Sequence, residues 1–340
     1  MPRHPALRVA LLAAIIAAIA IGLPVARPDR ASAADNGLWS VFPTTVPTGP
    51  GQLARPFFQP MLTPGVPVQD SVTITNKTPD QTINFDLYAA DAFNTREGGF
   101  ASRRRTDPKR EMGAWISLLV GNVIIPPQRA IDVPFTISPP PDATPGDHAG
   151  SIVALNTTPT VSHQGSLTVR SIQAVGTRVY GRVAGPLAPR LDVTELQVSS
   201  HAGVGGLLGG AVDADVAYRV VNTGNVRLSP TAKLTVSPMI GGATHVKTLH
   251  VPELLPRGSA VVHQRVSGVV PVGRLTARVT VTSPAAKTTA TSSTWVVPWL
   301  LIAIIVVLVL VLWYWLRRRR RRRREVGVAP PPERESVLAQ

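Results

Sequence analysis

The stretch VDADVAYRVVN, residues Val212–Asn222, alternates apolar side chains with polar or small ones. Successive side chains of a β-strand point to opposite faces, so a period of two predicts a strand with one buried face. The turn sequence Asn222-Thr223-Gly224-Asn225 follows directly, as expected where one strand ends and another begins. The buried face would hold Val212, Ala214, Val216, Tyr218 and Val220.

The same alternation recurs on both sides of this stretch. It is present in Ile83–Tyr88, Ile131–Ile137 and Leu275–Thr282, and Val68–Asn76 ends in an asparagine and a turn, as Val212–Asn222 does. With 33 prolines, 27 glycines and 5% aromatic residues, the composition is typical of many short strands joined by turns. The sequence therefore predicts an all-β fold.

The domain organisation follows from where the alternation stops. Gly185-Pro186-Leu187-Ala188-Pro189 interrupts it near the middle of the chain. We therefore predict two Ig-like β-sandwich domains in tandem, a first at residues 35–184 and a second at residues 185–282. Residues 283–294 are mostly Ser, Thr, Ala and Pro, a composition that favours a flexible stalk.

Residues 295–316 predict a single transmembrane helix. No charged residue occurs from Val296 to Leu316. At about 1.5 Å per residue the segment is roughly 33 Å long, enough for a hydrocarbon core of about 30 Å. A row of arginines then opens the tail, residues 317–340, which marks that side as cytoplasmic and is expected to attract anionic lipid headgroups. The row consists of Arg317, Arg318, Arg319, Arg320, Arg321, Arg322, Arg323 and Arg324.

The N-terminus has the order of a secretory signal. Arg3 and Arg8 precede the apolar stretch Val9–Ala26, and Ala31-Ser32-Ala33 provides small residues for cleavage. This order predicts a signal peptide at residues 1–34, with an uncleaved signal anchor as the alternative, because the apolar stretch is long. In either case the bulk of the chain is expected outside the cell, at the cell membrane.

Charge and cysteine content exclude several classes of protein. More than half of the formal net charge of +15 lies in the arginine row, so the charge does not indicate a nucleic-acid partner. The chain has no cysteine, which excludes disulfides, cysteine-ligated zinc and thiol nucleophiles. The histidines are scattered without HExxH spacing, and no GxSxG motif is present. We therefore expect a protein that is not an enzyme and has no catalytic residues, no metal and no cofactor.

The polar stretch Asp91–Ala114 interrupts the strand pattern of the first half. Long connections without periodicity inside a compact sandwich are often functional. Its cations could contact carboxylates or phosphates of a wall polymer through charge-assisted hydrogen bonds. The alternative is a solvated loop whose charge is balanced by Asp107 and Glu111. The candidate ligand-binding residues are Arg103, Arg104, Arg105, Lys109 and Arg110.

Two adjacent segments carry a family resemblance. VPFTI at Val133–Ile137, followed by PDATPGDHAGSI at Pro141–Ile152, resembles the WxL-interacting protein family of Gram-positive surface proteins. The resemblance implies a first domain that binds peptidoglycan, a second Ig-like domain that binds partner proteins, one membrane helix and a basic tail. It supplies no ligand residues.

These observations lead to two functional hypotheses. The first is a non-enzymatic, single-pass surface protein of a bacterium whose extracellular β-sandwiches bind peptidoglycan or another cell-wall polymer, other surface proteins, or both. The alternative is a membrane-tethered accessory for the assembly or export of secreted surface proteins. Both place the protein in the cell membrane with its tail in the cytoplasm.

Overall fold

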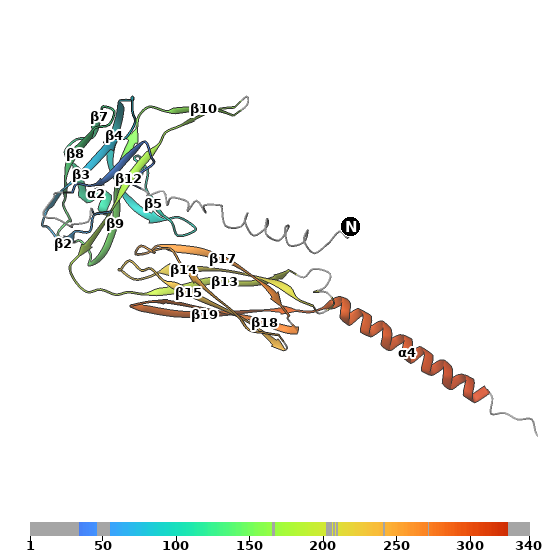
Figure 1. The fold of residues 1–340 in the computed structure, drawn as a ribbon. Helices are drawn as coiled ribbons and strands as arrows, with labels where there is room; N and C mark the ends of the chain where they lie inside the picture. Colours follow the sequence, from blue (N-terminus) through green and yellow to red (C-terminus); the bar gives the residue numbers. More distant parts are fainter. Residues whose placement is uncertain are drawn as a thin grey trace, which may run out of the picture.

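The structure is a computed structural model, and it describes residues 34–45, 55–164, 167–201, 206, 208, 210–240, 242–270 and 272–325. The expected signal peptide, apart from Ala34, and the tail beyond Glu325 lie outside the described residues. The predicted all-β class is confirmed: antiparallel sheets form two β-sandwiches that follow each other along the chain, and one long apolar helix follows the second (Figure 1).

The first sandwich packs two sheets face to face. One has the strand order β1-β3-β8-β6, and the other has the order β2-β12-β9-β4-β5, with β7 also paired to β4. The first sheet consists of β1 (Trp39–Pro43), β3 (Val68–Asn76), β8 (Ala130–Ile137) and β6 (Ile116–Leu118). The second consists of β2 (Met61–Leu62), β12 (Ala174–Val183), β9 (Gly146–Asn156), β4 (Ile83–Asn94), β5 (Phe100–Ser102) and β7 (Asn122–Ile125).

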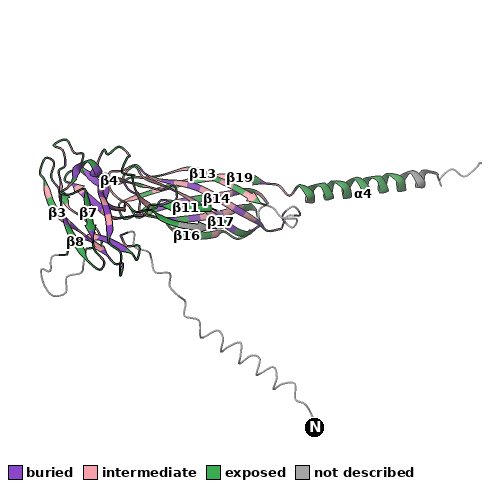
Figure 2. Ribbon diagram, turned by 90° about the horizontal axis from the view of Figure 1, so that it is seen from above, coloured by how far each residue is buried: buried purple, intermediate pink, exposed green. Residues whose placement is uncertain are grey.

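The alternation in the sequence fills the space between these sheets. Ile74 on β3, Phe85 on β4, Phe135 on β8 and Ile152 on β9 are fully buried. Figure 2 shows the buried positions concentrated in the strands of the two sandwiches. At about 25 cal/mol for each Å² of apolar surface removed from water, such burial is what holds a domain without disulfides together.

A two-stranded arm extends from this sandwich. It consists of β10 (Thr160–Gln164) and β11 (Leu167–Ser171), which pair with each other, and it connects β9 to β12. Figure 1 shows the arm reaching away from the body of the sandwich. Every residue of β11 is exposed.

The second sandwich packs a three-stranded sheet, β13-β14-β17, on a four-stranded sheet, β16-β15-β18-β19. Tyr218 on β14 and Leu234 on β15 are buried between them, as the alternation predicts. The strands are β13 (Leu191–His201), β14 (Val212–Asn222), β17 (Ser259–Val269), β16 (His245–His250), β15 (Thr231–Ile240), β18 (Val272–Ser283) and β19 (Ala286–Val296).

The expected stalk at residues 283–294 is wrong. Ser283 ends β18, Pro284 and Ala285 form a turn, and the remaining residues lie in β19, which pairs with β18 from Ser283↔Ala286 to Gly273↔Val296. The alternating Thr, Ala and Ser side chains suit a half-buried edge strand, so a composition typical of linkers here forms a strand. The helix α4 (Trp299–Glu325) therefore begins three residues after the sandwich ends, and Trp295 belongs to the strand. Within α4, Trp299–Arg319 is long and apolar enough to cross a membrane, with a mean hydropathy of 2.8.

Candidate functional site

The basic stretch Asp91–Ala114 is only partly irregular: residues 103–111, which hold the five candidate cations, lie in neither a helix nor a strand, and regular elements flank them. β4 continues to Asn94, turns into β5, and the short helix α2 (Met112–Trp115) follows. The carboxylate of Asp91 accepts hydrogen bonds from the backbone N–H groups of Arg110, Glu111 and Gly113 at 2.6, 3.1 and 2.7 Å, and these fix the start of α2. A Cβ at Gly113 would lie 2.5 Å from the backbone of Ala90, so only glycine fits there.

The candidate cations of this stretch have different surroundings. Arg105 forms an ion pair with Asp86 on β4. The guanidinium of Arg103 lies 4.9 Å from the ring centroid of Phe93, a cation–π contact. Arg103 and Arg110 both line a depression of about 340 Å³ that also touches Pro256 of the second sandwich. The structure therefore brings Arg103 and Arg110 to one cavity and places Arg105 in a different pair.

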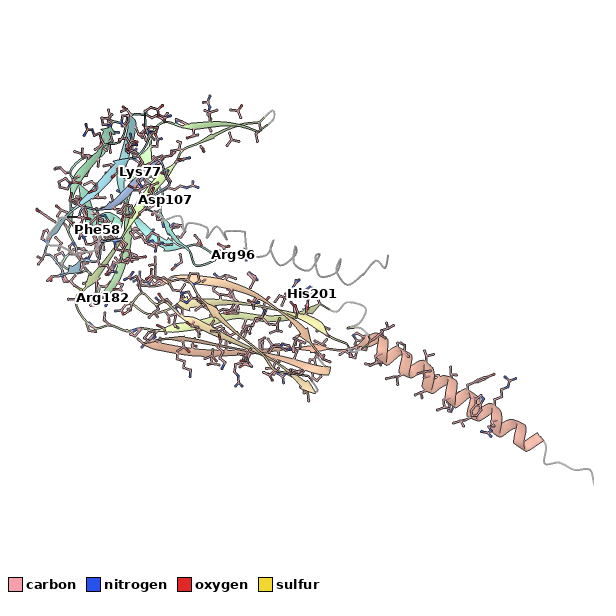
Figure 3. The ribbon with its side chains drawn as sticks, viewed as in Figure 1. Phe58, Lys77, Arg96, Asp107, Arg182 and His201 are labelled. Atoms are coloured by element: carbon pink, nitrogen blue, oxygen red, sulfur yellow. The ribbon has the colours of Figure 1, made fainter. Side chains whose placement is uncertain are left out.

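The tip of the β4–β5 hairpin contacts the second sandwich. The side-chain amide of Asn94 donates to the backbone oxygen of Glu253 and accepts from the N–H of Leu255, at 2.8 and 2.9 Å. The backbone oxygen of Arg96 accepts from the N–H of Val261 on the edge strand β17 at 2.8 Å. Figure 3 shows Arg96 at this junction. Part of the stretch that looked like a ligand-binding loop therefore joins the two domains.

A charged cluster lies deeper in the same interface. The hydroxyl of Tyr180 on β12 donates to Glu253 at 2.8 Å, and Glu253 also pairs with Arg227 at 3.0 Å. Burial, with the Glu253 carboxylate beside it, raises the pKa of Tyr180 to about 12. Burial would raise the pKa of Asp147, but hydrogen bonds from the side chain of Arg182 and the N–H of Arg227 outweigh it and hold that pKa below its usual value.

His148 forms a third contact at the interface. Its Nδ1 lies 3.2 Å from Glu111, and its Nε2 lies 2.9 Å from the backbone oxygen of Thr144. Both partners are acceptors, so the doubly protonated ring suits them. Burial lowers the pKa of His148, but these two hydrogen bonds raise it by more, and the bond from His148 lowers the pKa of Glu111. Arg257 of the second sandwich also pairs with Glu111, at 3.1 Å.

The β10–β11 arm presents apolar side chains to solvent. Val161 is 49% exposed, Leu167 60%, and Val169 37%, and Ile172, just after the arm, is 58% exposed. In the part of the arm that the structure describes, neither strand pairs with a third strand. The arm also carries a single full charge, Arg170. The arm was not predicted from the sequence, because its only signal is the short alternation at Leu167–Ser171.

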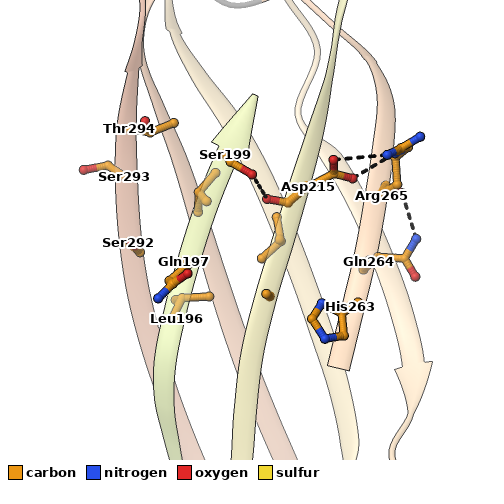
Figure 4. A pocket seen from close by; sticks show the side chains of 13 residues that line it. Leu196, Gln197, Ser199, Asp215, His263, Gln264, Arg265, Ser292, Ser293 and Thr294 are labelled. Atoms are coloured by element: carbon orange, nitrogen blue, oxygen red, sulfur yellow. Dashed lines mark hydrogen bonds and ion pairs between the residues drawn. The ribbon is translucent and has the colours of Figure 1, made fainter. Parts of the chain in front are cut away.

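A polar groove crosses the outer face of the second sandwich. It has a volume of about 810 Å³ and is lined by residues of β13, β14, β17 and β19. Ala217 is the small residue between Gln197 and His263, its partners on the neighbouring strands, and so forms the floor. Asp215 and Arg265 close one side with a paired contact at 2.8 and 3.2 Å (Figure 4).

The groove has no arrangement suited to nucleophilic catalysis. His201 pairs with Asp215 at 2.9 Å, but the hydroxyl of Ser199 lies 3.5 Å from the backbone oxygen of Asp215 and is not bonded to that histidine. Among the described residues, no group of three or more His, Asp or Glu side chains is placed to hold a metal ion.

The arginine row continues the helix α4, whose described part reaches Glu325. Arg317 and Arg319 lie 5.0 and 5.2 Å from the ring centroids of Trp313 and Trp315, one turn earlier. These contacts hold the guanidinium groups of Arg317 and Arg319 against the aromatic end of the helix, as expected for residues at a membrane surface.

The sequence matches no protein-family model and no curated protein. Among solved structures the chain is similar to a chaperone–tip adhesin complex of CFA/I fimbriae, at 11% identity and a TM-score of 0.33, covering 76% of this chain and 99% of that chain. It is similar to the class 5 fimbriae chaperone CfaA, at 14% identity and a TM-score of 0.32, covering 71% and 97%. It is also similar to a PapD-like domain of human CEP192, at 9% identity and a TM-score of 0.25, covering 49% and 96%. These likenesses concern the PapD-like, Ig-like fold, and TM-scores of this size carry no argument about function.

Proposed function

We propose that this chain is a non-enzymatic, membrane-tethered protein that binds extended segments of secreted or surface polypeptides through the β10–β11 arm. The accessory role in assembly or export is thus preferred to wall binding. The single observation that carries this proposal is the arm itself: a ribbon with exposed apolar side chains, to which no third strand is paired within the part that the structure describes.

An exposed ribbon of this kind tends to pair with another polypeptide. An isolated two-stranded hairpin is marginally stable in water, and exposed strand edges of low charge tend to pair with other chains. The backbone groups along β10 and β11 can hydrogen-bond an added strand, while Leu167 and Val169 can bury their side chains against it. This is β-strand addition, in which backbone bonds give affinity and side chains give specificity.

The anchor supports an extracellular location. Trp299–Arg319 has the length and composition of a membrane span, and the arginine row that follows favours a cytoplasmic tail. In this orientation the sandwiches and the arm project outside the cell, where exported polypeptides pass.

Crosslinking in cells tests this proposal. A photo-crosslinking residue at Leu167 should give a small set of discrete protein adducts. Val169→Lys should reduce these adducts about tenfold, because it places a charge on the face of the arm that the added polypeptide would cover. Leu119→Lys is the matched control, because Leu119 is exposed on the same sandwich but away from the arm, and it should leave the adducts unchanged. Adducts that persist in Val169→Lys would contradict the proposal.

Wall-polymer binding is the second candidate, and the polar groove favours it. Gln197, His263 and Gln264 offer hydrogen-bonding groups around the small floor residue Ala217, as a glycan chain requires. The resemblance to the WxL-interacting proteins points the same way. If the groove binds peptidoglycan, Ala217→Gln should fill it and abolish sedimentation of the chain with purified cell wall. Thr289→Gln on β19 should not.

A further inference from the structure

The end of the second sandwich nearest α4 is closely tied to the helix. Only Val297 and Pro298 separate β19 from α4. The N–H of Trp299 donates to the backbone oxygen of Val297 at 2.9 Å, and the N–H of Ile302 donates to that of Pro298 at 3.1 Å. Proline has a fixed φ and a two-residue link has little freedom, so the sandwich cannot move far from the point where the helix begins.

Strand register shows which parts of the sandwich lie at this end. Val296 pairs with Gly273 on β18, and the neighbouring Val272 pairs with Ile240 on β15. In the other sheet, Val212 on β14 pairs with Val269 on β17. The connections β15–β16 and β17–β18 therefore leave the sandwich on the same side as α4.

Large apolar side chains are exposed at this end. Met239 is 65% exposed and Trp295 is 69% exposed. They flank Gly273 on the outer face of the sheet: a Cβ placed on that glycine would lie 3.9 Å from the sulfur of Met239 and 3.8 Å from the ring of Trp295. Val270, in the adjacent connection, and Trp299, the first residue of α4, are exposed as well. We call Met239, Val270, Trp295 and Trp299 the helix-end patch.

The charge distribution separates this end from the opposite one. The connections at residues 241–244, 270–271 and 297–298 contain no charged residue, and neither does the sequence between His201 and Asp213. At the opposite end, the β14–β15 connection carries Arg227 and the β16–β17 connection carries Glu253 and Arg257. Neutral loops with tryptophan and methionine suit the lipid–water interface, where charged loops would lose hydration.

We propose that the helix-end patch is seated in the headgroup region of the membrane that α4 crosses, so that the second sandwich stands on the outer surface instead of moving freely on a tether. This proposal rests on the proposed membrane anchoring by α4. Arg274 is the charged residue next to the patch: it lies opposite Trp295 in the register, and its Nε donates to the hydroxyl of Ser293 at 2.8 Å.

The seating has a geometric consequence. β18 has 12 residues, and at about 3.3 Å per residue it spans roughly 40 Å from Val272 to Ser283. The turn Pro284-Ala285 therefore lies far above the membrane, and the connections that contact the first sandwich lie at that same end. The first sandwich and its arm are thereby held well away from the lipid surface.

Spin labels test the seating, and the absence of cysteine allows single-cysteine variants of the full chain without background. The chain is reconstituted in vesicles of phosphatidylcholine and phosphatidylglycerol, and each nitroxide is assayed for collision with oxygen and with a neutral nickel chelate. Met239→Cys and Val270→Cys report on the patch, Ala285→Cys on the far end, and Val309→Cys on the middle of α4.

We expect the labels at Met239 and Val270 to show headgroup depth, with at least a threefold higher ratio of oxygen to nickel accessibility than the label at Ala285. The seating alone would be overturned if the labels at Met239 and Val270 were as accessible to the nickel chelate as the label at Ala285 while the Val309 label lay deep in the bilayer. Labels at the patch protected from both reagents would show a protein partner or a second copy instead and would also overturn it. An aqueous Val309 label would overturn the anchoring itself.

Discussion

Arg227 of the second sandwich lies across the ring of Tyr180 of the first, with its guanidinium carbon 3.7 Å from the ring centroid. Glu253 completes the contact by accepting from Arg227 at 3.0 Å and from the Tyr180 hydroxyl at 2.8 Å. The three groups are largely withdrawn from solvent and contact one another, so they couple the two domains more strongly than exposed ion pairs would, although the Nε of Arg227 is buried without a hydrogen-bond partner.

Removing the guanidinium should weaken this coupling. Arg227→Met keeps an apolar stem over Tyr180 but leaves Glu253 without its cation, so we expect a loss of about 1–3 kcal/mol and separate melting of the two sandwiches. Calorimetry of the full chain in detergent measures both effects. Arg265→Met is the control, because its pair with Asp215 is exposed to solvent and should contribute little to stability. A single unshifted transition in Arg227→Met would contradict the coupling.

The contact between His148 and Glu111 should make stability depend on pH. The pKa of His148 is raised, so its contribution is complete below the usual value of 6.5 and is lost as pH rises through the raised pKa. The pKa of Glu111 is lowered, so its contribution is complete above the usual value of 4.5 and is lost as pH falls through the lowered pKa. The pair therefore stabilises the interface most between about pH 4.5 and 6.5.

His148→Gln tests this dependence. The melting temperature of the variant, subtracted from that of the parent at each pH, should give a difference that is largest in that window and declines above it. His245→Gln on β16 controls for loss of an imidazole away from the interface. A difference that does not change between pH 5 and neutrality would show that the ring acts by packing on Trp115, 4.6 Å away, and not by its charge.

The sequence similarity between Asn76 and Asn222 has a physical basis. Each is fully buried at the end of its strand, and each accepts a hydrogen bond from the N–H two residues later, Thr78 at 3.0 Å and Gly224 at 3.1 Å. Each side-chain amide also donates to distant backbone carbonyls, including Ile125 for Asn76. The strands could be predicted because they depend on the period of two, and the asparagine turns because the bonds to Thr78 and Gly224 are local. The bonds to Ile125 and Leu254 join residues far apart in the chain and could not be predicted.

Asn76→Ala and Asn222→Ala should both be strongly destabilising. Each leaves buried carbonyls without a donor, at a cost of about 2–4 kcal/mol in the free energy of unfolding. Asn156→Ala is the matched control, since Asn156 makes the equivalent bond to Thr158 at the surface, at 2.9 Å, and should cost about 1 kcal/mol or less. Urea unfolding of the full chain distinguishes them, and equal midpoints for Asn76→Ala and Asn156→Ala would contradict this account.

The interface could not be predicted from the sequence, because its contacts join residues far apart in the chain. The block Pro141–Ile152, which carries the family resemblance, supplies Asp147 and His148 to the domain junction. A Cβ at Gly146 would lie 2.3 Å from the backbone oxygen of Asn225, so the glycine of this block is required for the two domains to meet. Within this block, Gly146, Asp147 and His148 lie at the domain junction, while Ile152 belongs to the core of the first sandwich.

A test of binding by the basic stretch should leave in place the cations that contact other parts of the protein, Arg103 and Arg105. Replacing Arg103, Arg104 and Arg105 together would also break the Phe93 contact and the Asp86 pair, so a loss of binding could reflect structural damage. The double variant Arg104→Gln with Lys109→Gln is a more specific test, because each change removes a charge and keeps the hydrogen bonds of the backbone. If the stretch binds an acidic wall polymer, this double variant should weaken sedimentation with cell wall several-fold at low salt and flatten its salt dependence.

Arg105→Gln is the control. It removes a charge already neutralised by Asp86 and should change sedimentation much less. The double variant removes two charges and Arg105→Gln removes one, so an effect of the double variant only about twice that of Arg105→Gln would mean that net charge alone, and not an exposed cluster, governs attraction to the wall.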